Sequence, residues 1–377
     1  MSIRKCQDYE LGQVSSVLSK VLDDLGGLGV HIRAGDRVLL KPNLLMSAPP
    51  EKAIVTHPVV MEALACMVLD CRGKPFIGDS PPFGHLSKVL TKSGYDPFMR
   101  RLEVQAVPFS ERLTIEFPES RIFRRIELAK EVFDFDMVLN IAKLKTHCQM
   151  LLTLSVKNLF GTVIGSDKVS WHLRAGRDTD SFATVLVQIY EKVRPAVSII
   201  DGILAMEGNG PNNGSPRHLG VLMGSTDGIA LDATVCKLVG YPVNALRTSY
   251  LGDRMGIGTT NPCHVKVLGD DLEGFPLRDF VPPKSINVVW NLSHWNPVRR
   301  FLENHVVTRP VIDPAVCKTC GVCLEHCPPQ AISKKNQTMV IDKSKCISCF
   351  CCHELCIHGA VKIVQPRLGK FLGSLTR

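Results

Sequence analysis

Hydrophobic and polar positions alternate with two different periods from the start of the chain to about residue 279. Short apolar runs rich in β-branched residues, typical of buried strands, occupy positions 38–40, 76–78, 137–141, 197–200 and 220–223. Residues 58–71 and 181–193 instead carry apolar side chains at the spacing of a helix. Because strands and helices alternate, the pattern predicts an α/β domain with a mainly parallel sheet and flanking helices.

The alternation stops near residue 280. Residues 280–310 contain Pro282, Pro283, Trp290 and Trp295, a composition that indicates a packed connector rather than a flexible linker. The residues from 311 to 377 then form a small segment with a composition of its own. We therefore expect an α/β domain over 1–279, a connector over 280–310 and a small α+β module over 311–377.

Cysteine is concentrated in this last segment. Nine of the 15 cysteines fall between Cys317 and Cys356, and such clustering in a chain that lacks a signal-peptide pattern favours metal ligation over disulfides. The pattern CxxCxxCxxxC starts at Cys317 and again at Cys346, so the two runs form a repeat with a constant offset. This spacing is similar to that of bacterial two-cluster ferredoxins, in which the fourth cysteine of each run binds the other cluster.

The spacing thus predicts two [4Fe-4S] clusters. The first would be held by Cys317, Cys320, Cys323 and Cys356, and the second by Cys346, Cys349, Cys352 and Cys327. Structural zinc also uses four cysteines with CxxC spacing, but two complete runs at one offset favour the clusters. Ile357 stands where a proline usually follows the last cysteine. Cys351 is a ninth cysteine, either an exchangeable ligand or a bystander thiol.

Composition and charge narrow the class of protein. With 45% hydrophobic and 21% charged residues and no apolar run of membrane-spanning length, we expect a cytoplasmic protein without a membrane span. The formal charge of +9 permits binding to nucleic acid. However, the chain has no dense run of lysine and arginine interleaved with aromatic residues, so we expect no nucleic-acid partner.

Polar side chains gather where the predicted strands end, which is where open α/β sheets bind ligands. The candidates for catalysis are His147, Lys143, Lys145 and Asp79, and those for binding a substrate or cofactor are Lys41, Asn43, Lys157 and Asn158. If the strand that begins at residue 137 continues, Lys143, Lys145 and His147 share one face. The lysines, Lys168 among them, favour an anionic ligand such as a carboxylate or phosphate.

Within this set, His147 is the natural proton donor or acceptor, because the pKa of histidine is ordinarily near neutrality. Asp79 or Asp201 would orient it or bind a metal. Simpler structural roles are open for each residue. A lysine in a loop is usually a solvated surface charge, and Asp201 could cap a turn. The glycine-rich stretch 207–211 lacks both the dinucleotide and the Walker patterns, so nucleotide binding is not expected.

Several of these motifs together resemble one known family. They are KPN at 41–43, THP at 56–58, GDSP at 78–81, AKLKTH at 142–147, SVKNLFG at 155–161 and MEGNGP at 206–211. In this order they resemble the DUF362 family of uncharacterised proteins over residues 36–270. The resemblance implies an α/β fold fused to a C-terminal ferredoxin module, and it implies no particular reaction.

Three functions fit the sequence. In the first, an iron-sulfur oxidoreductase, a redox partner protein supplies electrons, and the module relays them to an anionic small molecule held by the α/β domain. In the second, the protein is a non-catalytic ferredoxin-type electron carrier whose α/β domain docks a partner complex. In the third, the clusters act as a redox sensor or structural staple in a nucleic-acid-linked protein. The convergent polar residues favour the first interpretation.

Overall fold

A computed structural model of the chain describes residues 1–82, 84–120, 122–165, 167–176, 178–271, 277, 279–284 and 308–364. The strands of its central sheet are β1 (Ser2–Lys5), β2 (Arg37–Lys41), β3 (Lys74–Asp79), β4 (Gln105–Pro108), β7 (Met137–His147), β8 (Leu151–Thr153), β9 (Val197–Glu207), β10 (Ser215–Ser225) and β11 (Leu268–Gly269). A separate hairpin joins β5 (Arg112–Glu116) and β6 (Arg125–Ala129).

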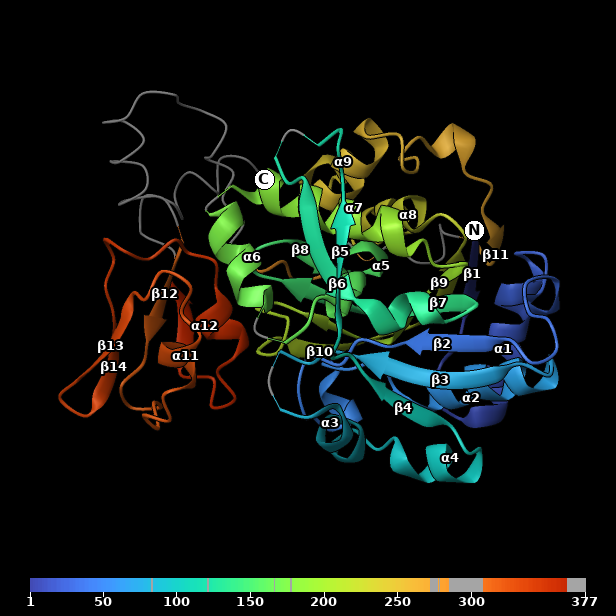
Figure 1. Cartoon of the computed structure of the whole chain (residues 1–377), viewed down its shortest axis with the longest axis horizontal. Coiled ribbons are helices and arrows are strands. Elements are labelled where there is room, and N and C mark those ends of the chain that lie inside the picture. Colours follow the sequence, from blue (N-terminus) through green and yellow to red (C-terminus); the bar gives the residue numbers. More distant parts are fainter. Residues whose placement is uncertain are drawn as a thin grey trace.

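The strand order is β11-β1-β10-β9-β7-β2-β3-β4, with β8 paired to β7 at the side (Figure 1). Strands β4, β3, β2, β7 and β9 run parallel, whereas β10 is antiparallel to both of its neighbours. The predicted α/β architecture with a largely parallel sheet is confirmed. The runs predicted at 137–141 and 197–200 are only the first halves of two 11-residue strands.

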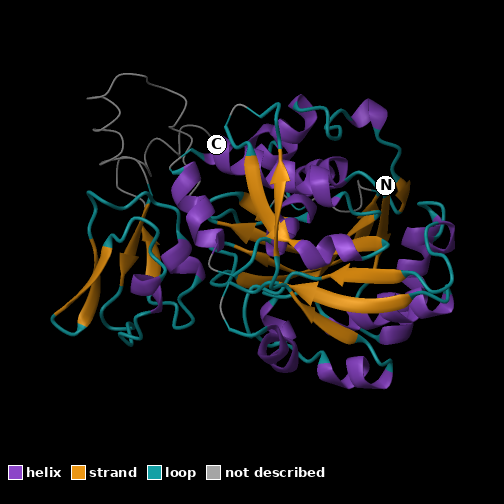
Figure 2. Cartoon of the chain, in the orientation of Figure 1, coloured by secondary structure: helices purple, strands orange, loops and turns teal. Residues whose placement is uncertain are grey.

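Helices cover both faces of the sheet, as Figure 2 shows. They are α1 (Leu11–Asp23), α2 (Pro58–Asp70), α3 (Leu86–Lys92), α4 (Asp96–Arg101), α5 (Ser155–Asn158), α6 (Asp167–Ala175), α7 (Thr179–Val193), α8 (Gly228–Leu238) and α9 (Arg247–Arg254). Val38 and Leu40 of β2 pack into the same core as α1 and α2, whereas Leu39 packs into the core that contains α7. Two buried faces explain why the strands read as continuous apolar runs.

The C-terminal module is built as a duplicated unit. Its elements are β12 (Arg309–Ile312), α11 (Val322–Glu325), β13 (Ile332–Lys335), β14 (Thr338–Ile341), α12 (Cys351–Glu354) and β15 (Val361–Val364). The second three follow the first three at the same offset that separates the cysteine runs, for example from Val322 to Cys351. Strand β12 pairs with β15, and β13 pairs with β14.

The left-handed backbone positions repeat at this offset as well. Thr319 and Ser348 have φ of 51° and 54°, and Gly321 and Phe350 have φ of 85° and 61°. Each pair lies between cysteines, where the chain must turn tightly enough to aim several thiols inward. The duplication expected from the sequence is therefore present in the backbone.

The predicted connector and its two tryptophans lie largely outside the described residues, as does the end of the chain from residue 365. The domain boundaries remain predictions for that reason. Across the described part of the chain, no helix is both long enough and apolar enough to cross a membrane.

Candidate active site

The carboxyl ends of β7, β2 and β3 meet at one edge of the sheet, because these strands are parallel neighbours. At the end of β2, Lys41 is fully buried and its ammonium lies 2.9 Å from the carboxylate of Asp79 at the end of β3. Asp79 also accepts hydrogen bonds from the backbone N–H groups of Leu44 and Ser80. This saturated ion pair fixes the two strand ends relative to each other.

The short helix α5 also lies at this edge of the sheet. Asp232 of α8 accepts hydrogen bonds from the backbone N–H groups of Ser155 and Val156, at 2.8 and 3.0 Å, and so caps the start of α5. Asn158 at its end donates to Asn140 of β7, and Asn43 donates to Asn158 at 2.9 Å. Lys157 is thereby held over the edge of the sheet.

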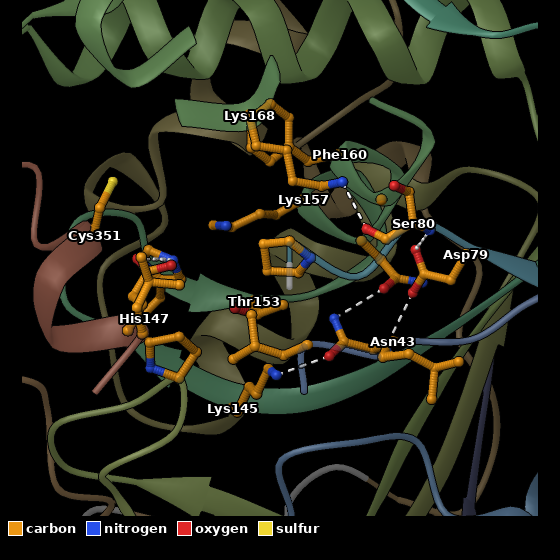
Figure 3. Close-up of a pocket in the computed structure, with 18 of the residues that line it drawn as sticks. Asn43, Asp79, Ser80, Lys145, His147, Thr153, Lys157, Phe160, Lys168 and Cys351 are labelled. Carbon is orange, nitrogen blue, oxygen red and sulfur yellow. Dashed lines mark hydrogen bonds and ion pairs between the residues drawn. The ribbon is translucent and has the colours of Figure 1, made fainter. Parts of the chain in front are cut away.

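These elements and the C-terminal module line a cavity of about 90 Å³ (Figure 3). The polar residues that line it are Asn43, Asp79, Ser80, Lys145, His147, Thr153, Lys157, Asn158, Lys168, His172, Cys351 and Glu354. The last two come from α12, the helix that also carries the predicted cluster ligand Cys352. The cavity is therefore bounded by both modules, and it lies next to the cysteines of the second run.

Three lysines line the cavity. Lys145 donates to Asn43 and to the carbonyl of Ile54, and Lys168 donates to the carbonyls of Ser80 and Val163. Burial lowers the pKa of Lys145 well below its ordinary value and that of Lys168 to about 7. Lys157 differs from both, because its ammonium has no hydrogen-bond partner among the residues that the structure describes and lies over the ring of Phe160.

Opposite the lysines, His147 faces Glu354 of the C-terminal module, with 3.0 Å between Nε2 and Oε1. The other ring nitrogen, Nδ1, accepts the backbone N–H groups of Gln149 and Met150, so the proton of the neutral ring sits on Nε2. Burial, together with Lys157, lowers the pKa of His147 to about 4. Burial alone would raise the pKa of Glu354, but His147, Lys157 and His172 lower it to about 2.

This pair corrects the sequence interpretation of His147 in two respects. Its pKa is not near neutrality, because the ring is buried among positive charges. Neither Asp79 nor Asp201 orients it, because those carboxylates pair with Lys41 and Lys143. The orienting carboxylate, Glu354, was missed, because a glutamate among cysteine ligands carries no sequence signal for a role in a distant part of the chain.

Lys143 does not line the cavity. Its ammonium lies 2.7 Å from Asp201 and 2.9 Å from the hydroxyl of Tyr9, and Tyr9 stacks on His57 with 3.5 Å between ring centroids. The pairing of β7 with β9 shifts register between Lys143 and Lys145, so the two lysines end in different surroundings. Lys143 is therefore separate from the cavity that Lys145 and His147 line. Asp201 is a buried ion-pair partner rather than a turn cap.

The other candidates divide between the cavity and its support. Asn43, Lys145, His147, Lys157, Asn158 and Asp79 line the cavity, whereas Lys41 supports it through Asp79. Lys41, Lys143 and Lys145 are each exposed by 1% or less, so they are not solvated surface charges.

The glycine-rich stretch 207–211 and the asparagines after it dock the C-terminal module. Asn212 and Asn213 donate to the carbonyls of Glu354 and His353, at 2.5 and 3.0 Å. His353 Nε2 lies 3.1 Å from the carbonyl of Asn209. These contacts hold α12 against the mouth of the cavity, and they give the loop a role that its sequence did not predict.

The cysteines meet in the two predicted groups. Cys327, Cys346, Cys349 and Cys352 line one small cavity together with apolar side chains. Burial and the neighbouring thiols of Cys356, Cys320 and Cys317 raise the pKa of Cys323 to about 11, which places these four cysteines together. The fourth cysteine of each run thus lies with the first three of the other.

Two further observations concern what these groups can hold. Backbone N–H groups of Ala331 and Ala360, which are equivalent positions of the repeat, donate to the sulfurs of Cys327 and Cys356, both at 3.2 Å, as expected around cluster thiolates. Within the described ranges, no three histidine, cysteine, aspartate or glutamate side chains are arranged to hold a single metal ion. Since the thiolates of a cubane bind different iron atoms, this second finding concerns mononuclear sites.

The chain is similar to several known proteins. The profile of a family described as "Domain of unknown function (DUF362)" matches residues 38–237. A thylakoid-associated protein of Synechocystis sp. is 40% identical over 260 residues, which cover 69% of this chain and 80% of that protein.

A shorter match of 54 residues is 48% identical to dihydromethanopterin reductase (acceptor) of Methanosarcina mazei and covers 14% of this chain and 23% of the reductase. Among solved structures, the lactate racemase apoprotein of Thermoanaerobacterium thermosaccharolyticum aligns with a TM-score of 0.41 and 11% identity, over 63% of this chain and 56% of that one.

Proposed function

The chain belongs to the DUF362 family, and we propose that it is an iron-sulfur oxidoreductase in which electrons from a redox partner protein reach an anionic small molecule in the cavity between its two modules. A short match to a reductase supports redox chemistry in general. The observation that carries the proposal is the position of α12. This four-residue helix contains the predicted cluster ligand Cys352 and also presents Cys351 and Glu354 to the cavity.

The cysteine groups fit two [4Fe-4S] clusters in their grouping and in the N–H groups that point at their sulfurs. Cys317, Cys320, Cys323 and Cys356 would hold one cluster, and Cys346, Cys349, Cys352 and Cys327 the other. When bound, the clusters would supply single electrons at low potential. Because α12 carries Cys352 and also lines the cavity, the second group of cysteines lies next to the place where a molecule would bind.

The cavity residues would bind and orient the molecule and would donate or accept protons. Lys157 offers an ammonium without a protein hydrogen-bond partner among the described residues, and the side chains of Lys145 and Lys168 line the same cavity. His147 carries its ring proton on Nε2, 3.0 Å from Oε1 of Glu354, so this pair holds a proton at the cavity wall. Lys168, with a pKa of about 7, is the lysine best placed to exchange a proton near neutral pH.

A non-catalytic electron carrier is the second candidate. The groove between α6 and the C-terminal module favours it, because Leu173, Leu324 and Cys327 line that groove and both leucines are exposed. A partner that docks there would approach the second group of cysteines without entering the cavity. The two functions differ in whether the cavity holds a molecule.

The first test is anaerobic purification with iron and sulfide counts, followed by electron paramagnetic resonance of the reduced protein. We expect about eight irons and eight sulfides, with the spectrum of two interacting clusters. Cys327→Ser should remove the signal of the second cluster, whereas replacement of the exposed Cys263 by serine should change neither count nor spectrum.

Zinc in place of iron, in protein kept from air throughout, would contradict electron transfer through this module. Intact clusters in a protein whose cavity binds no small molecule would favour the carrier over the oxidoreductase.

A further inference from the structure

We propose that the cavity binds a short-chain monocarboxylic acid, with the carboxylate on Lys157 and the hydrocarbon chain against the apolar part of the wall. The inference specifies the class of anionic molecule in the proposed function. The redox role of that molecule rests on the proposed function. The binding itself is argued from the cavity alone.

The first argument is the contrast between Lys157 and the other two lysines. Lys145 and Lys168 each donate to two protein oxygens, so their ammonium groups are largely engaged. Lys157 has no such acceptor in the described part of the chain, and Figure 3 shows it extending across the cavity toward Cys351 and His147. A half-buried ammonium without an acceptor is a place for an anion.

The second argument comes from unpaired polar atoms in the same wall. Thr153 Oγ1 and His172 Nδ1 are buried and have no hydrogen-bond partner among the described residues. The two side chains are 3% and 5% exposed. Because burying a polar atom without a partner is unfavourable, two such atoms in the wall that Lys157 also lines indicate a polar guest.

The third argument is the charge that the guest can carry. The carboxylate of Asp79 is paired with the ammonium of Lys41 at 2.9 Å, whereas the carboxylate of Glu354 lines the cavity itself and faces the ring of His147. That carboxylate repels a second negative charge in so small a space. The balance favours a single negative charge over a phosphate dianion.

The fourth argument is the remaining wall, which is apolar. Leu44, Leu45, Phe160, Val169 and Leu355 line it. These side chains match a hydrocarbon group and offer nothing to the additional oxygens of phosphate or sulfate. The volume of about 90 Å³ has room for a short-chain acid.

Isothermal titration calorimetry of the anaerobically purified full chain tests this inference with acetate, butyrate and inorganic phosphate. Butyrate should bind about tenfold tighter than acetate, because its two additional CH₂ groups are buried. Lys157→Met should weaken butyrate binding at least about tenfold through loss of a charge-assisted hydrogen bond. Lys192→Met is the matched control, because this exposed lysine also lies over a phenylalanine ring, that of Phe117, and should leave binding unchanged.

Three outcomes would overturn the inference: no binding of either carboxylate, tighter binding of phosphate than of butyrate, or equal butyrate affinity in wild type and Lys157→Met. Failure of the proposed function gives a different result. Protein that holds zinc or no cluster and still binds butyrate through Lys157 would remove the oxidoreductase and leave the carboxylate site.

Discussion

At the scale of single residues, the cavity is built from histidines that stay neutral. His172 lies against the rings of Phe160 and Phe182, with 5.9 and 4.4 Å between ring centroids. Burial lowers its pKa to about 4, whereas an unfolded chain gives histidine a pKa of roughly 6.5. The unfolded state therefore binds a proton in a pH range in which the folded state does not.

This difference predicts that the free energy of unfolding decreases as the solution becomes more acidic. Because the folded pKa is the lower one, the contribution of His172 is complete above roughly pH 6.5 and is lost as the pH falls toward 4. Acidification from pH 7 to pH 5 should cost about 2 kcal/mol through this residue. Urea unfolding of anaerobic protein at both pH values should show a smaller difference for His172→Phe. Replacement of the exposed His31 should not alter it.

The sequence predicted several of the residues that line the cavity. Asn43, Lys145, His147 and Lys157 were predicted from their positions at or beyond the ends of predicted strands, and all four line the cavity. Glu354 was not predicted, because its role depends on the contact between two modules that the sequence does not specify. The low pKa of His147 could not be predicted from the sequence either, because it results from burial and from the nearby Lys157.

At the scale of elements, the sequence predicted the starts of the strands better than their ends. The sequence predicted where β2, β3 and β7 begin, because buried parallel strands are apolar on both faces. It gave the continuation of β7 to His147 only as a condition, because three polar side chains, Lys143, Lys145 and His147, lie in this part of the strand. They remain in the strand since Asp201 pairs with Lys143, and since Asn43 and the carbonyl of Ile54 accept from Lys145.

The turn that follows α5 leads to a test at this scale. A Cβ at Gly161 would overlap the carboxylate of Asp79 and the ammonium of Lys41, which are themselves fixed by their ion pair. Gly161→Ala should therefore lower the free energy of unfolding by about 1–3 kcal/mol and displace Lys157 from the cavity. Gly12→Ala in α1 is the control, because a Cβ there meets only the flexible end of Glu10.

Unfolding by urea measures the first effect, and loss of butyrate binding in folded Gly161→Ala measures the second. Equal stability of the two alanine variants would show that the Asp79–Lys41 pair moves freely, against the rigid edge described above.

At the scale of the whole molecule, the position of the C-terminal module determines whether the cavity is complete. Figure 1 shows this module against the side of the α/β domain where α6 lies. Its contacts with the other module include hydrogen bonds from the loop after β9 and a small apolar cluster of Cys148, Phe350 and Ile363. Without these contacts, Glu354 and Cys351 would leave the cavity and His147 would lose its carboxylate.

Docking should therefore weaken when the loop loses its donors. The double variant Asn212→Ala and Asn213→Ala removes two hydrogen bonds to α12, each worth about 1 kcal/mol, so the open form should become about 30-fold more populated. Hydrogen exchange of the α12 amides should accelerate accordingly while the iron content stays constant. Asn261→Ala, which removes a cap from a distant turn, should leave α12 exchange unchanged. Unchanged exchange in the double variant would mean that the apolar cluster alone holds the module in place.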